Sequence, residues 1–291
     1  AKYDEALWTE LVELGWPGIA VAAEHGGQDL GIVELAVLLE ELGYACSATP
    51  FLSTATAAAV IQAAGSAEQQ GRWLSVLTSG EATAGIGTAE LAADADGAAV
   101  IILLDGEDAQ LLDGAQADVE PFQSIDPTRR FGQVSGQGEP LGTGAAERIA
   151  TAIASEVVGV CQRALDMTLE YVKDRKQFGV PVGSFQAVSH RCAQMLLQTE
   201  SARSAAYYAA WAADADPERL TEAAALAAAA AADGGREVTA SAIQGHGGIG
   251  FTWEADVHWL YKRAQLDAAL LGSSRRHRAT LARIGAARAS G

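Results

Sequence analysis

Apolar residues recur at helical spacing in the first part of the chain. The leucines of ELAVLLEELG, at positions 35, 38, 39 and 42, recur at helical spacing, and Gly43 follows where a helix would end. Breaks rich in glycine or proline interrupt the pattern at 15–18, 25–27 and 48–50. The pattern therefore predicts at least three short helices before Gly80.

After Glu81 the pattern changes to short apolar segments separated by acidic turns. The run Ala99–Leu104 is continuously apolar, as strands often are, and the turns near it have the sequences DGAA, DGED and DGAQ. Asp-Gly turns between short apolar runs are typical of β-hairpins. We therefore expect a small β region of a few hairpins, rather than a parallel sheet, ending near Gly144.

Long helical segments fill the rest of the chain. Apolar residues form one stripe along 147–174, and a second helical segment begins at Ser184. Two more helices are expected at 223–232 and 256–271. The first of these runs is rich in alanine, which has the highest helix propensity. Four such helices predict a bundle.

These patterns predict a mainly α protein of three domains. The N-terminal helical domain is expected to span residues 1–82, a shortened β domain 83–144, and a C-terminal four-helix bundle domain 145–291. A chain of 291 residues that is 49% hydrophobic can bury a core of this size.

The charge of the chain excludes two classes of partner. It carries 37 acidic against 20 basic residues, a formal net charge of −17. Such an excess repels nucleic-acid phosphates and anionic membranes, so we expect neither nucleic acid nor membrane as a partner. The alanine-rich run is also shorter than the roughly 20 residues that a membrane span requires.

The cysteines and the amino end indicate a cytoplasmic protein. Cys46, Cys161 and Cys192 are odd in number and far apart, which fits reduced thiols better than a disulfide framework or a metal site. The amino-terminal residues lack the basic and apolar regions of a signal peptide. We expect a cytoplasmic location and no metal.

Two short motifs carry candidate chemistry. The first is RKQFG (Arg175–Gly179), followed by FQAV (Phe185–Val188), and the second is QGHGGIGF (Gln244–Phe251), where a helix-forming sequence stops. Alone, the first could be a charged helix end with one buried aromatic residue. The second could be only a helix terminator, since glycine commonly ends helices. Together, in this order and inside a predicted bundle, they are more specific.

With the segment Glu13–Gly43, these motifs make nearly the whole chain resemble the acyl-CoA dehydrogenase superfamily. That segment contains AAEHGG, which is similar to the family's Pro-Glu-Glu-Tyr-Gly-Gly. The resemblance implies flavin adenine dinucleotide (FAD) bound across a subunit interface. The two motifs would then hold the pyrophosphate and adenosine half of a flavin from the neighbouring subunit.

The residue types suit that half of the cofactor. Arg175 could bind the pyrophosphate in a bidentate manner, and Gly247 and Gly248 could leave the backbone open to it. The remaining candidates are amides that can hydrogen-bond without charge and aromatic rings that can pack on the cofactor. They are Gln177, Gln186, Gln244, Phe178 and Phe185. His246 occupies a variable position of the motif. We therefore expect it to act as a spacer in the motif or to lie beside the phosphate, rather than to be catalytic.

The chain departs from the family at the catalytic base. Family members remove the α-proton with a glutamate, which lies in one of two places depending on the subgroup. The first place carries Leu271 here and the second carries Ile149. Glu147 is nearby but would point to another helix face, and it suits the first turn of a helix. We therefore expect no catalytic residue in this chain.

The middle of the chain also departs from the family. The segment Gly87–Asp94 lacks the Gly-Ser pair of the family's Thr-Glu-x-x-x-Gly-Ser-Asp element, and the β region is about half the usual length and has no tryptophan. We expect that the chain does not hold its own isoalloxazine ring.

The resemblance therefore implies a catalytically incomplete subunit of a heteromeric, FAD-dependent acyl-CoA dehydrogenase. A homologous full-length partner with the catalytic glutamate would complete an α2β2 heterotetramer, and this chain alone would be inactive. The tail Leu270–His277 is similar to that of actinobacterial steroid side-chain enzymes, which implies a steroid acyl-CoA substrate, with electrons passing to electron-transfer flavoprotein. A flavin-dependent monooxygenase of the same fold and a scaffold subunit that does not contact flavin remain alternatives.

Overall fold

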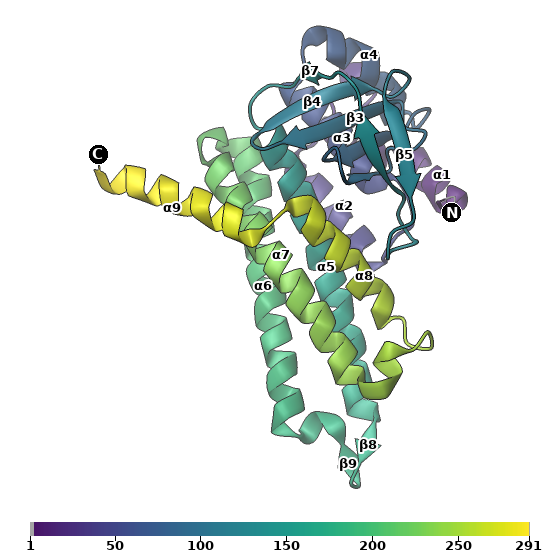
Figure 1. The fold of residues 1–291 in the computed structure, drawn as a ribbon, viewed down its shortest axis with the longest axis vertical. Helices are drawn as coiled ribbons and strands as arrows, with labels where there is room; N and C mark the ends of the chain where they lie inside the picture. The colour runs from purple at the N-terminus through teal and green to yellow at the C-terminus, as the bar shows by residue number, and fades with distance from the viewer. Residues whose placement is uncertain (1–2, 291) are drawn as a thin grey trace. The chain divides into compact units, whose positions relative to one another are not determined.

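The computed structural model describes residues 3–290, and most of them lie in helices (Figure 1). The helices are α1 (Glu5–Glu13), α2 (Ile32–Tyr44), α3 (Phe51–Ala64), α4 (Ala67–Thr78), α5 (Ala145–Asp174), α6 (Gln186–Ala215), α7 (Leu220–His246), α8 (Val257–Leu271) and α9 (Ser274–Ser290). In this described range a seven-stranded sheet falls between α4 and α5 in sequence, and a two-stranded hairpin between α5 and α6. The predicted mainly α class with a small middle sheet is confirmed.

The chain folds into two compact units, each assembled from separate stretches of sequence. One consists of the residues up to 38, 48–152 and 210–221; the other consists of 39–47, 153–209 and the residues from 222 onward. These units cut across the predicted boundaries at 82 and 144, so the three-domain division stays a prediction.

The sheet belongs to the first unit and has the strand order β5-β6-β2-β1-β3-β4-β7. Its strands are β1 (Ala84–Gly87), β2 (Ala92–Ala93), β3 (Val100–Asp105), β4 (Asp108–Asp113), β5 (Asp118–Phe122), β6 (Phe131–Ser135) and β7 (Glu139–Pro140). Strands β1 and β3 are parallel, whereas the other neighbouring pairs are antiparallel.

The hairpin prediction is right for one of the three Asp-Gly turns. DGED joins β3 to β4, with Asp105 paired to Asp108. DGAA leads from β2 into β3 and DGAQ leads from β4 toward β5, and these strands are not neighbours. The expectation of hairpins without parallel pairing was wrong for β1 and β3. Strand β2 occupies one edge of β1, so β3 pairs with the other edge and runs parallel to β1.

Helix α3 supports the sheet with small side chains. Its residues Phe51–Ile61 are all buried, and most are alanine, serine or threonine. The Thr54 hydroxyl accepts a hydrogen bond from the Ala84 backbone N–H at 3.2 Å, which fixes α3 against β1. The Ser53 hydroxyl donates to the buried Asp94 carboxylate at 2.7 Å. Small polar residues thus let a helix lie close to a strand and still satisfy buried polar groups.

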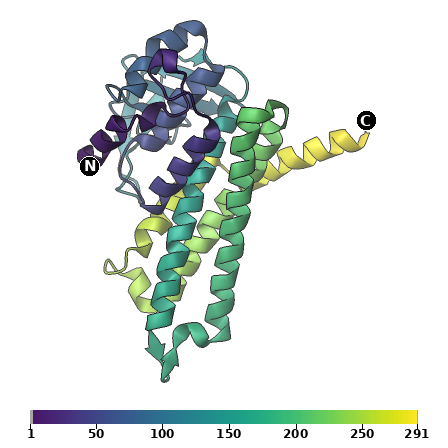
Figure 2. The ribbon, with the colours of Figure 1, turned by 180° about the vertical axis from the view of Figure 1, so that it is seen from behind.

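Long helices make up the second unit. The parts of α5, α6, α7 and α8 that belong to it run side by side (Figures 1 and 2), as the predicted C-terminal bundle requires. Most alanines of the run 223–232 in α7 are buried, because small side chains let neighbouring helices approach closely.

Helix α9 was not predicted. It starts after Gly272, whose φ of 79° ends α8, and none of its described residues is buried. It contains five arginines and no acidic residue. Two of these arginines hold it to α7, through Arg278 with Asp233 and Arg288 with Glu222, each at 2.6 Å. Its sequence has no continuous apolar stripe, which explains why periodicity did not reveal it.

Two glycines let the end of α2 cross α5 at backbone contact. A Cβ atom at Gly43 would lie 2.1 Å from the carbonyl oxygen of Glu156, and one at Gly159 would lie 1.8 Å from that of Glu40. Both distances are far below any real contact, so a larger residue at either position would force the helices apart.

A buried ion pair fixes the same crossing from the side of α8. The Arg263 guanidinium is completely buried and donates to the Glu156 carboxylate at 3.1 Å and to the Ser47 carbonyl oxygen at 2.9 Å. Glu156 lies on α5, and Ser47 follows α2. One side chain of α8 therefore holds α5 and the end of α2 together.

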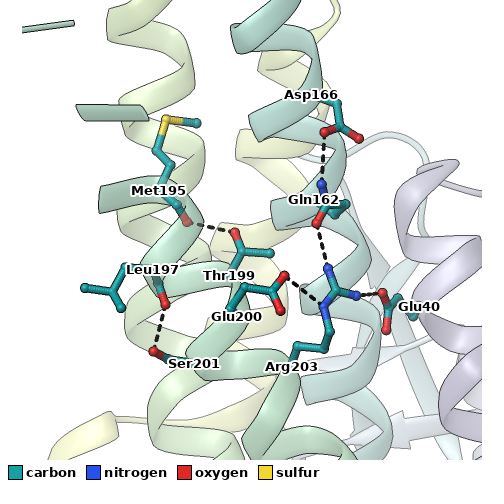
Figure 3. Close-up of polar contacts among 9 residues, drawn as sticks. All are labelled: Glu40, Gln162, Asp166, Met195, Leu197, Thr199, Glu200, Ser201 and Arg203. Carbon is teal, nitrogen blue, oxygen red and sulfur yellow. Dashed lines mark hydrogen bonds and ion pairs between the residues drawn. The ribbon is translucent and has the colours of Figure 1, made fainter. Parts of the chain in front are cut away.

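A second polar network joins α2, α5 and α6 (Figure 3). Arg203 of α6 forms an ion pair with Glu40 and donates to the Gln162 side-chain oxygen at 2.6 Å. Gln162 in turn donates to Asp166 at 2.9 Å, and the Tyr44 hydroxyl donates to the same carboxylate at 3.1 Å. Two separate polar networks therefore hold the end of α2 within the second unit.

We predict that Arg263→Met lowers the free energy of unfolding by about 3–5 kcal/mol, because it leaves the Glu156 carboxylate buried without its cation. Arg219→Met is the control, since Arg219 is 57% exposed and pairs with Asp216 three residues away, and it should cost less than about 1 kcal/mol. Urea denaturation measures both. Similar losses for the two variants would contradict the role of the buried pair.

Candidate functional site

The first motif folds into a tight hairpin between α5 and α6. Strand β8 (Lys176–Gln177) pairs with β9 (Val180–Pro181), and the two turn residues Phe178 and Gly179 have φ values of 52° and 83°. Two successive left-handed residues are typical of the hairpin turn whose twist matches the strands. A phenylalanine is rare in that conformation, and here its side chain is 93% exposed.

The hairpin presents its functional groups to solvent. Phe185 stands edge-on to Phe178, with ring centroids 6.3 Å apart, and is also exposed. Arg175, Gln177 and Gln186 are exposed as well. The Arg175 guanidinium has no carboxylate partner among residues 3–290. An unpaired cation and two aromatic rings are therefore open to a ligand or another chain.

The second motif begins inside a helix. Helix α7 continues through Gln244 and Gly245 to His246, and the turn η5 (Gly247–Phe251) follows. The expectation that the helix stops where the motif starts is therefore wrong by three residues. Only from Gly247 onward does the motif terminate the helix, and the Gln244 side chain projects from its last turn and is exposed.

The four glycines of this motif are of two kinds. A Cβ atom at Gly245 would lie 2.8 Å from the Thr168 side chain, and one at Gly250 would lie 2.4 Å from the Ile243 carbonyl oxygen. At Gly247 and Gly248 a Cβ atom would meet no described atom within 4 Å. Two glycines thus allow close packing, and the other two leave the backbone open to approach.

His246 has a structural position. Its ring is buried, stacks on Tyr171 with centroids 4.6 Å apart, and shares a hydrogen bond of 2.8 Å with the Ala242 carbonyl oxygen through Nδ1. The stack joins the end of α7 to α5. It therefore brings the second motif close to the first, which follows α5.

The two motifs meet at a hollow of about 510 Å³. Its polar and aromatic lining consists of Arg163, Glu170, Tyr171, Asp174, Arg175 and His246. Of the predicted cofactor residues, Arg175 lines this hollow; Gln177, Phe178, Phe185, Gln186, Gln244, Gly247 and Gly248 do not. Sequence reasoning missed Glu170 and Tyr171, although they precede Arg175 by about one helical turn at the end of α5.

Comparison with known proteins decides the family. The model of the acyl-CoA dehydrogenase C-terminal domain matches residues 140–285, and that of the N-terminal domain matches residues 1–81. The chain belongs to the acyl-CoA dehydrogenase family.

Individual relatives agree with this assignment. Acyl-CoA dehydrogenase IpdE2 of Mycolicibacterium smegmatis is 37% identical over 94% of this chain and 86% of its own length. The solved Tcur3481-Tcur3483 steroid ACAD G363A variant has a TM-score of 0.89 at 26% identity, covering 99% of this chain and 90% of that one. The ChsE4-ChsE5 complex from Mycobacterium tuberculosis has a TM-score of 0.85 at 23% identity, covering 99% and 89%, and supports the acyl-CoA dehydrogenase fold.

Membership of the acyl-CoA dehydrogenase family implies FAD as the cofactor. The exposed residues of this chain fit its pyrophosphate half, because Arg175 is a cation without a carboxylate partner in the described range and Gly247 and Gly248 leave the backbone accessible. Glu170 and Asp174 beside Arg175 limit how much negative charge the hollow itself can accept.

The two positions at which the sequence resemblance would place the catalytic base hold buried aliphatic side chains. Ile149 is 0% exposed in the first unit, and Leu271 is 5% exposed in the second. Glu147 lies in the first turn of α5, and its carboxylate accepts a hydrogen bond from the Thr221 hydroxyl at 2.9 Å. The helix start and this bond give Glu147 a structural role.

The buried thiol of Cys161 is an unreactive group. Burial, and then the charge of Asp267, raise the pKa of the Cys161 thiol to about 12, so this thiol stays protonated at neutral pH.

Among residues 3–290, no group of three or more His, Cys, Asp or Glu side chains could hold a metal ion. No helix in the same range is long and apolar enough to cross a membrane.

We predict that Gly250→Ala lowers the free energy of unfolding by about 1–3 kcal/mol, because its Cβ atom would collide with the Ile243 carbonyl group. Gly248→Ala is the matched control in the same turn and should change stability by less than about 0.5 kcal/mol. Chemical denaturation of both variants checks whether the glycines of the motif are of two kinds. Equal losses of stability would show that they are not.

Proposed function

We propose that this chain is one subunit of a heteromeric acyl-CoA dehydrogenase. In this proposal it contributes the residues that hold the pyrophosphate and adenosine half of an FAD whose reacting ring lies in a partner subunit. The observation that carries the proposal is a contrast. Ile149 and Leu271 are buried and cannot take up a proton, whereas Arg175 is exposed and has no carboxylate partner in the described range.

Each candidate residue of the two motifs has a task in this proposal. Arg175 binds the pyrophosphate, and Gly247 and Gly248 allow the phosphates to approach the backbone. Gln177, Gln186 and Gln244 supply neutral hydrogen bonds. Phe178 and Phe185 cover apolar parts of the cofactor and of the partner. All of these residues lie in the second unit, so one unit would carry the whole half-site.

A homologous acyl-CoA dehydrogenase with the catalytic glutamate is the proposed partner, in an α2β2 heterotetramer. Bound FAD supplies a hydride acceptor for α,β-dehydrogenation of an acyl-CoA. The description of the Tcur3481-Tcur3483 relative as a steroid ACAD supports a steroid acyl-CoA as the substrate. Electron-transfer flavoprotein would then reoxidise the flavin.

A scaffold subunit that does not contact flavin is the second candidate. The observation in its favour is that Glu170 and Asp174 line the same hollow as Arg175. Two carboxylates there would repel a pyrophosphate and could instead pair with cations of a partner chain. The two candidates differ in whether FAD retention depends on Arg175.

The first test compares the purified chain alone with the chain co-expressed with a glutamate-carrying homologue. We expect flavin absorbance and acyl-CoA dehydrogenation in the complex and neither in the chain alone, because the base positions of this chain are aliphatic. Stoichiometric FAD and turnover in the isolated chain would refute the half-site proposal.

The second test is Arg175→Ala within the complex. Loss of a charge-assisted contact to the pyrophosphate should weaken FAD binding roughly tenfold or more. Arg219→Ala, at an exposed arginine of the first unit, is the control and should leave FAD binding unchanged. Gly248→Val should also lower FAD occupancy without unfolding the chain. Full occupancy in both site variants would favour the scaffold.

A further inference from the structure

A second hollow lies in the same unit and shares no lining residue with the hollow beside Arg175. Its volume is about 440 Å³, within the range of small-molecule sites, and its walls come from α7, η5 and α8. The groups that matter here are Phe251, Trp253, His258 and Lys262. Neither family motif nor base position accounts for the last three of them.

His258 is buried without a hydrogen-bond partner. It is 9% exposed, and within the described residues neither Nδ1 nor Nε2 has a partner. Its ring lies 4.7 Å from the ring of Trp253 and 4.3 Å from that of Trp259. Buried polar groups are nearly always hydrogen-bonded, so an imidazole that lines a hollow with both nitrogens unused indicates a missing ligand.

The surroundings of His258 favour the neutral imidazole. Burial lowers the pKa of His258, and the charge of Lys262 lowers it further, although Asp256 acts in the opposite direction. A neutral imidazole offers one donor and one acceptor. A ligand that satisfies both must therefore present an acceptor and a donor.

Lys262 adds a positive charge to the same hollow. Its ammonium group lies 4.2 Å from the ring centroid of Trp253 and 4.7 Å from that of Trp259. No carboxylate in the described part of the chain forms an ion pair with it. The indole faces hold the cation at the hollow, and an anion can still approach it.

These groups select a class of ligand. A purely apolar body would leave both imidazole nitrogens unpaired, and a simple anion would not use the exposed rings of Phe251 and Trp253. A flat heteroaromatic ring with donor and acceptor edges and an attached phosphate uses all of them. We propose that this hollow binds an adenosine phosphate, with the purine beside Trp253 and His258 and the phosphate at Lys262.

Two sources carry this chemistry: a free nucleotide and the adenosine end of coenzyme A. The proposal is independent of the half-site function, because it concerns different residues and can be measured on the full chain without a partner.

The test is calorimetric titration of the full chain with AMP. Lys262→Met keeps the length of the side chain and removes its charge, and His258→Phe keeps the ring and removes its nitrogens. Each should weaken AMP binding at least tenfold, and adenosine should bind the unmodified chain as weakly as AMP binds Lys262→Met. Lys173→Met, at an exposed lysine outside this hollow, is the control and should bind AMP normally.

Thermal unfolding separates binding from folding. His258→Phe should melt at the same temperature as the unmodified chain or higher, because it removes two unpaired buried nitrogens. Two results would overturn the proposal. One is the absence of any heat of binding with millimolar AMP, and the other is an AMP affinity in Lys262→Met and His258→Phe equal to that of the unmodified chain.

Coenzyme A identifies the source. Binding of coenzyme A at least tenfold tighter than AMP, lost in Lys262→Met, would assign the hollow to the thioester carrier. Equal affinity of AMP and coenzyme A would support recognition of the nucleotide alone.

Discussion

The buried guanidinium of Arg263 holds the second unit together. A buried charge is tolerated only when it is paired and its donors are satisfied, and Arg263 meets both conditions by binding Glu156 on α5 and the Ser47 carbonyl group after α2. The close crossing of α2 and α5 brings these acceptors together. Arg263 lies in the middle of α8, so this helix is tied to α5 and to the end of α2 at one central residue.

Much of the fold could be predicted from sequence, because helix periodicity and short motifs depend on residues that are close together along the chain. Apolar periodicity located the helices of the bundle, and the resemblance to acyl-CoA dehydrogenases gave the order of the helical and β regions. The parallel pairing of β1 with β3 could not be predicted, since it depends on which edge of β1 remains free after β2 has paired. Arg263 and Glu156 are 107 residues apart, so no local pattern relates them.

The candidate site was predictable only in part for the same reason. The motifs supplied Arg175 and four glycines, but which glycines pack against neighbours and which face open space depends on tertiary structure. The stack of His246 on Tyr171 and the hollow they share depend on it as well. His258 and Lys262 had no motif to mark them, and their importance follows from burial and from the absence of partners in the described structure. The cofactor roles assigned from the motifs remain predictions.

The turn at Phe178 has a consequence for the energetics of assembly. Both turn residues are already fixed in the left-handed region and the flanking strands are paired, so covering this side chain would cost little further backbone entropy. A side chain that is 93% exposed in the free chain would gain about 1.5–3 kcal/mol from complete burial. The hairpin is thus a rigid contact whose hydrophobic free energy becomes available only when another surface covers it.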